Sequence, residues 1–155
     1  FSIETQVMSV AETQNPGYLE FPMMEELCLK HDETCESIRT ATLSIERELS
    51  GNLDREDRRE LASAVADVSG ELAGLYELKQ QAGFFDGPEG SSARDQERLA
   101  HLKSDYRRLL NELRQVEQET ETGKPSKARR QLSHWMSRFS DVCDREADVV
   151  SDIWN

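Results

Sequence analysis

The sequence predicts an all-α protein: an up-down-up-down antiparallel four-helix bundle preceded by an irregular N-terminal arm. Three observations predict this fold. Four long segments carry apolar residues at the three- and four-residue spacing of an amphipathic helix, and no segment alternates as a strand would. Short Gly-, Pro- or Ser-containing segments separate them. The length, 155 residues, suits one domain with a hydrophobic core.

The arm is expected to cover residues 1–21. This stretch has no sustained helical period and contains the turn signal NPG at positions 15–17. We expect Ile3, Val7 and Tyr18 to pack the arm against the body of the protein.

The bundle is expected to cover residues 22–155. Start and stop signals bound its four helices, at about 22–49, 54–81, 92–119 and 126–155. Asp54 is a favoured N-cap residue type, and Ser92 stands three residues before Asp95, which is the spacing of a capping box. Similar helix lengths and short connections are typical of an up-down-up-down bundle.

The charge balance excludes several classes of partner. Asp and Glu number 31 against 19 Lys and Arg, giving a net charge of −12. Such a surface repels phosphate groups, so we expect neither nucleic acid nor an anionic membrane as a partner.

No apolar run reaches the roughly 18 residues of a transmembrane helix. The start shows no signal-peptide pattern, although a first residue Phe leaves the natural start of the chain open.

The cysteines indicate a reduced, cytoplasmic setting. Cys28, Cys35 and Cys143 are odd in number and lack the spacing of a disulfide framework. Cys28 and Cys35 lie seven residues apart and share a helix face. We expect these two cysteines to be small buried apolar residues rather than a redox pair.

Polar side chains interrupt the apolar stripes of the expected helices. They are His31 in the first stripe, Glu71 at the edge of the second, with Asp67 one turn earlier, Tyr106 in the third and Glu146 in the fourth. In an up-down bundle, all four helices bring such a residue to roughly 13–20 Å from one end, at 1.5 Å per residue. Burying a lone carboxylate is costly unless it is paired or binds a metal. The sequence therefore predicts one polar cluster shared by the four helices.

Several arrangements would reconcile carboxylates at one level of the core. The carboxylates could be held by His31 as imidazolium, by a shared proton, by the Tyr106 hydroxyl or by a cation. Helix bundles build metal sites from inward-facing His and carboxylate side chains. The simpler alternative is a satisfied core histidine, a hydrogen-bonded tyrosine and a glutamate that reaches solvent. Without a metal, replacing Glu146 by Leu is expected to be neutral or stabilising. His101 and His134 are expected at the surface.

Two stretches within residues 22–155, LCLKHDETCESI and DVSGELAGLY, resemble segments of the hemerythrin-like (HHE cation-binding) family, and the resemblance covers all four expected helices. The stretch LCLKHDETCESI resembles its first ligand segment, with His31 in a ligand position. The stretch DVSGELAGLY resembles the second, where Glu71 matches a ligand and Asp67 replaces a histidine.

The last two helices also resemble that family with histidines missing. In LKSDYRRLLNEL, Tyr106 replaces a histidine, and in VCDREADVVSDIWN, Val142 replaces another while Glu146 matches the acidic ligand. The resemblance implies a non-heme di-iron centre, but the histidine set is depleted.

Three functional hypotheses follow from the resemblance. The first is a bundle without the usual di-iron ligands, acting as a binding, sensory or interaction domain for a small ligand or protein partner. The second is an altered metal site for iron, manganese or zinc that handles oxygen or a related small ligand. Its oxygen-rich ligand set would be His31, Glu71 and Glu146 with Asp67 or Tyr106. The third is an oxidoreductase that uses this metal. No catalytic residue is predicted from the sequence.

Overall fold

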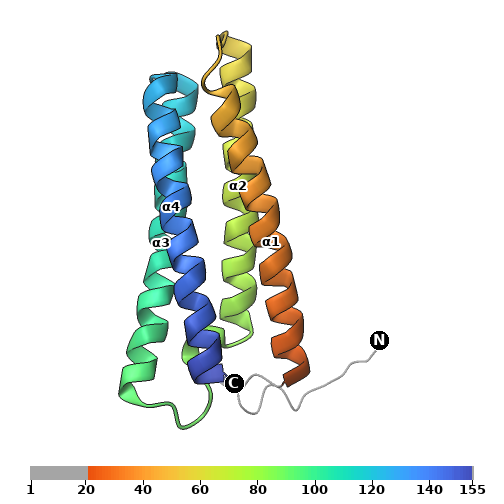
Figure 1. The fold of residues 1–155 in the computed structure, drawn as a ribbon, viewed down its shortest axis with the longest axis vertical. Helices are drawn as coiled ribbons and strands as arrows, with labels where there is room; N and C mark the ends of the chain where they lie inside the picture. The colour runs from red at the N-terminus through yellow and green to blue at the C-terminus, as the bar shows by residue number, and fades with distance from the viewer. Residues whose placement is uncertain (1–20, 155) are drawn as a thin grey trace.

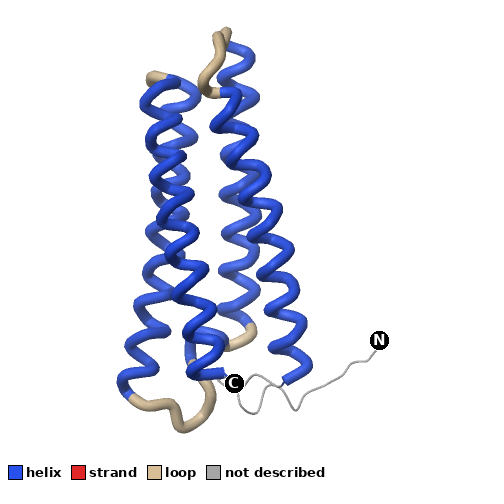
Figure 2. Tube along the Cα trace, viewed as in Figure 1, coloured by secondary structure: helices blue, strands red, loops and turns tan. Residues whose placement is uncertain are grey.

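Four antiparallel helices form the bundle that the sequence predicts. The computed structural model describes residues 21–154 and the side chains from residue 24 onward. The helices are α1 (Phe21–Glu48), α2 (Arg55–Gln81), α3 (Ala93–Thr122) and α4 (Pro125–Val149). They lie side by side with alternating direction (Figure 1), and Figure 2 shows no strand among residues 21–154. The expected arm, with Ile3, Val7 and Tyr18, lies outside the described residues.

The helix order in space follows the chain. Each helix packs against the next one, and α4 closes the ring against α1. The seam between α1 and α4 is the least extensive of these four contacts. The N-terminal ends of α1 and α3 therefore share one end of the bundle with the C-terminal ends of α2 and α4 (Figure 1). None of the described helices is long and apolar enough to cross a membrane.

The predicted capping residues start α2 and α3. Asp57 N donates to Asp54 Oδ1 at 2.7 Å, and Asp54 N donates back to Asp57 Oδ2 at 3.1 Å, which completes a capping box. Asp95 N donates to Ser92 Oγ at 3.1 Å. These bonds satisfy amide groups that the first helical turn leaves without partners. Pro125 opens α4, a position that suits its missing N–H.

Two segments near the shared end differ from the prediction. The loop after α2 contains a short 3₁₀ helix, η2 (Phe84–Asp86), that buries Phe84 and Phe85. After Val149, the chain continues as a π-helical turn, η3 (Val150–Trp154), rather than as regular α-helix. The Phe84 ring stacks on the Trp154 ring at a centroid distance of 6.1 Å. Aromatic packing thus draws both segments over the end of the core.

The core consists of the predicted apolar stripes with few polar members. Among residues 24–154, the buried polar or charged side chains are Thr34, Thr42, Lys79, Thr120 and Glu146. Thr42 and Thr120 donate to backbone carbonyls one turn earlier. Lys79 and Glu146 are therefore the two charged side chains that this part of the core must accommodate.

Candidate functional site

Lys79 is the centre of a buried polar cluster. The apolar stripe of α2 runs through Leu61, Val65, Val68, Leu72 and Leu75. Four residues after Leu75, the same face carries Lys79, whose side chain is 1% exposed. An ammonium group buried in this way costs several kcal/mol unless it is paired and hydrogen-bonded. Its partners therefore decide whether the arrangement is stable.

Each ammonium proton of Lys79 has an acceptor. Lys79 Nζ makes a short ion pair with Glu146 Oε2, lies 3.0 Å from Tyr106 Oη and lies 2.7 Å from His31 Nδ1. The Tyr106 hydroxyl donates to the second carboxylate oxygen, Glu146 Oε1, at 2.5 Å. Because an ammonium can only donate, we assign the His31 ring proton to Nε2. One side chain from each helix thus completes the cluster.

Burial and charge fix the role of the Tyr106 hydroxyl. Burial, followed by the neighbouring Glu146 carboxylate, raises the pKa of Tyr106 well above its ordinary value. The side chain therefore remains a neutral phenol that donates to Glu146. The ring of Phe84 lies 5.2 Å from Lys79 Nζ, so it adds cation–π attraction while it excludes water from the ammonium. Tyr106 contacts the same ammonium through its hydroxyl.

Three of the five residues predicted to share a site meet in this cluster: His31, Tyr106 and Glu146. Asp67 and Glu71 do not join it, contrary to the prediction, because both are exposed. Glu71 instead lines an outer groove between α1 and α2. A helix turns by about 100° per residue, so Glu71 at the correct depth still points away from the side of Leu72.

Val142 is buried in the core, at the position where the family pattern has a histidine. His101 and His134 are exposed, as predicted.

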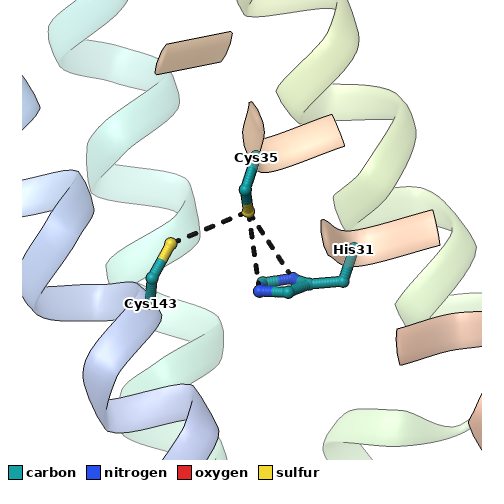
Figure 3. A group of neighbouring side chains, drawn as sticks. All are labelled: His31, Cys35 and Cys143. Atoms are coloured by element: carbon teal, nitrogen blue, oxygen red, sulfur yellow. Dashed lines mark hydrogen bonds between the residues drawn. The ribbon is translucent and has the colours of Figure 1, made fainter. Parts of the chain in front are cut away.

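A thiol pair lies directly beside the polar cluster. His31 and Cys35 are four residues apart on one face of α1, and His31 Nε2 lies 3.5 Å from Cys35 Sγ. Cys143 on α4 brings its sulfur to 3.7 Å from Cys35 Sγ (Figure 3). Cys28 contacts Met24 Sδ instead. Cys35 is buried in the core as predicted, and Cys28 packs against the core half-buried, but the contact between Cys35 and Cys143, 108 residues apart, was not predicted.

The surroundings of the pair favour a thiolate at Cys143. The pKa of Cys143 is lowered to about 5, chiefly because the Cys35 thiol donates a hydrogen bond to it. Burial opposes this shift, whereas His31 and the positive charge of Arg39 support it. The pKa of Cys35 is raised, because its proton is held between the two sulfurs and its sulfur is desolvated. Burial also raises the pKa of Cys28.

A pocket gives access to this thiolate. It lies along the seam between α1 and α4, has a volume of about 360 Å³, and is lined by Cys143, His31, Lys79 and Glu146 among others. Cys35, only 2% exposed, is not part of the pocket wall. Cys28 also lines this pocket, but of the two sulfurs that contact each other, a small molecule would reach Cys143 first, with Cys35 behind it.

Comparison with protein-family models, curated proteins and solved structures finds no match. The hemerythrin-like resemblance therefore stays a prediction from the sequence, and function is inferred from the site. That site has two adjoining halves: an oxygen-rich cluster that holds a lysine ammonium, and a dithiol at the edge of a pocket.

Proposed function

We propose that this chain is a hemerythrin-like bundle without the usual di-iron ligand set, and that it acts as a sensory domain through reversible oxidation of Cys35 and Cys143. The observation that carries the proposal is the 3.7 Å separation of the two sulfurs, with Cys143 at the pocket wall and Cys35 behind it. The resting dithiol state suits a reducing compartment such as the cytoplasm.

Lys79 is the main argument against an oxygen-rich metal centre at the neighbouring cluster. Its ammonium occupies the place among His31, Tyr106 and Glu146 where a cation would sit. A divalent ion placed among the same atoms would be repelled by that fixed positive charge in a medium of low dielectric constant. The alternative of iron, manganese or zinc held by His31 and carboxylates would require Lys79 to leave.

The proposed chemistry has two balanced steps with a peroxide as oxidant. The Cys143 thiolate attacks a peroxide oxygen, so that an S–O bond forms, the O–O bond breaks, and the leaving hydroxide or alkoxide takes up a proton. Cys35, as thiolate, then attacks the sulfenic sulfur, so that an S–S bond forms and water leaves after protonation. The two sulfurs are oxidised by two electrons and the peroxide is reduced. Low pKa, access and an adjacent resolving cysteine are the features of redox-sensing thiols.

Disulfide formation would also change the bundle. The sulfurs must approach from 3.7 Å to about 2.05 Å. Because Cys35 lies on α1 and Cys143 on α4, this approach pulls on the least extensive helix seam. A movement along that seam would reshape the pocket and provide the signal that a partner protein reads.

The test is peroxide titration of the reduced full chain, with free thiols counted and the disulfide mapped by mass spectrometry. We expect a Cys35–Cys143 disulfide, and the same product in Cys28→Ser, the matched control. In Cys35→Ser, we expect a sulfenic acid on Cys143 that a dimedone-type reagent traps. Oxidation no faster than that of the urea-unfolded chain, or a disulfide that includes Cys28, would overturn the proposal.

A further inference from the structure

We propose that His31, Cys35 and Cys143 also bind one zinc ion in the reduced protein, with the fourth coordination position facing the pocket and taken by water. The inference rests on the same thiol site as the proposed function, and it adds a metal-bound state in which both sulfurs are occupied. The three residues offer ligand atoms that all lie within 4.8 Å of one another.

Two of the three distances between the ligand atoms match the edges of a zinc tetrahedron, and the third, between Cys143 and His31, is within 4.8 Å. With Zn–S of 2.3 Å and Zn–N of 2.0–2.1 Å, the edges of a tetrahedron are roughly 3.8 Å between two sulfurs and roughly 3.6 Å between sulfur and nitrogen. The observed separations are 3.7 Å for Cys35 Sγ to Cys143 Sγ and 3.5 Å for Cys35 Sγ to His31 Nε2. An ion can therefore enter with little rearrangement of α1 and α4.

The second nitrogen of His31 meets the requirement for a metal-bound imidazole. Such a ring donates its other N–H to a carboxylate or carbonyl, which orients the ring. His31 Nδ1 lies 3.1 Å from Glu146 Oε2. When Nε2 binds the ion, the ring proton moves to Nδ1 and is donated to Glu146. Lys79 then loses Nδ1 as an acceptor, so its Nζ must move away from that nitrogen, 2.7 Å away, while it keeps Glu146 and Tyr106 as acceptors.

Charge distinguishes this thiolate site from the oxygen-rich cluster beside it. Two thiolates offset both charges of the ion, so the loaded site is neutral, and because the ion replaces one thiol proton, binding adds one positive charge near Lys79 rather than two. Thiolate and imidazole ligands favour zinc over manganese or magnesium. The pocket beside Cys143 and His31 leaves room for a water ligand, an arrangement of two Cys, one His and an open position that zinc proteins use.

The experiment measures metal binding by the reduced full chain directly. Zn²⁺ is titrated against a chromophoric chelator, and Co²⁺ serves as a spectroscopic substitute. We expect one ion per chain, thiolate-to-cobalt charge-transfer bands and the intense visible bands of tetrahedral Co²⁺. Cys28→Ser should bind like the unaltered chain, whereas Cys35→Ser, Cys143→Ser and His31→Gln should each weaken binding by more than about tenfold, since even outer-shell changes reach that range.

His31→Gln separates this inference from the proposed function, because it retains both sulfurs. If it still forms the disulfide but loses zinc affinity, both proposals stand. If the unaltered chain oxidises to the disulfide yet binds no stoichiometric Zn²⁺, the zinc site is wrong and the redox function survives. Undiminished Zn²⁺ binding by the Cys35→Ser/Cys143→Ser double variant would also overturn the zinc site, because the ion would then be held elsewhere.

Discussion

Replacing Glu146 by Leu should strongly destabilise the bundle, because it leaves the Lys79 ammonium buried without its counter-charge. Lys79 and Glu146 have side chains 1% and 4% exposed, and the carboxylate also accepts from the Tyr106 hydroxyl. Removing one partner of a buried ion pair costs about 3–5 kcal/mol. The expectation from sequence alone was a neutral or stabilising change, on the ground that packing can replace a buried polar network; the Lys79 ammonium, which the variant would leave buried, leads us to expect the opposite.

The double variant Lys79→Met/Glu146→Leu provides the control. Both charges are then gone, and apolar side chains of similar volume fill the space, a replacement that is often neutral or stabilising. We expect the double variant to be more stable than Glu146→Leu alone by at least about 2 kcal/mol.

Urea unfolding followed by circular dichroism, with a reductant and a chelator present, measures these differences. Similar slopes among the variants would show that stability alone has changed. A Glu146→Leu variant within about 1 kcal/mol of the unaltered chain, or a double variant no more stable than that single variant, would refute the reasoning.

Three further predictions concern single positions. At pH 6, iodoacetamide should label Cys143 far faster than Cys28. At that pH a pKa of about 5 leaves Cys143 about 90% thiolate, whereas an ordinary thiol is less than about 1% thiolate. The rate should fall as the pH drops through 5, because the thiolate is then protonated, and equal rates by peptide mass spectrometry would contradict this. Gly74→Ala, at an exposed α2 position with no atom within 4 Å of the new Cβ, should raise the free energy of unfolding by about 0.5–1 kcal/mol. Gly87→Ala should lower the free energy of unfolding by at least about 1 kcal/mol, because φ is +80° and the new Cβ would lie 2.9 Å from Leu99 Cδ1. Unchanged thermal unfolding of either glycine variant would count against the prediction for that variant.

The fold was predictable because local signals and periodicity agree along the chain. Apolar spacing identified the four helices, and Asp54 and Ser92 mark two of their starts as the N-caps that the structure shows. The η2 turn was not predicted, because Phe84 and Phe85 owe their burial to packing on η3 and α3 rather than to a local pattern.

The depth of the site residues along the bundle was predictable, but the direction in which each side chain points around its helix axis was not. Counting residues from the helix ends placed His31, Tyr106 and Glu146 at one level, and the structure brings them together. The same count admitted Glu71 because it ignores the direction in which a side chain points. Lys79 carried a usable signal, since it lies four residues after Leu75 on the buried face, where continuation of the stripe predicts a core position.

The meeting of Cys35 and Cys143 had no local signal. The two residues are separated by 108 positions, and their contact depends on how α1 and α4 are rotated against each other. Spacing within one helix could suggest only Cys28 and Cys35, which share a face but not a contact in the structure.

The Lys79 cluster takes one side chain from each of the four helices, and this constrains how the helices align along their axes. Layers of Leu and Val could tolerate one helix sliding past its neighbours by a turn, about 5.4 Å, because one aliphatic layer resembles the next. His31, Lys79, Tyr106 and Glu146 each come from a different helix, so the same slide would strand an ammonium or a carboxylate in hydrocarbon. We expect this cluster to select a single axial register, much as one buried polar residue fixes the alignment of a coiled coil.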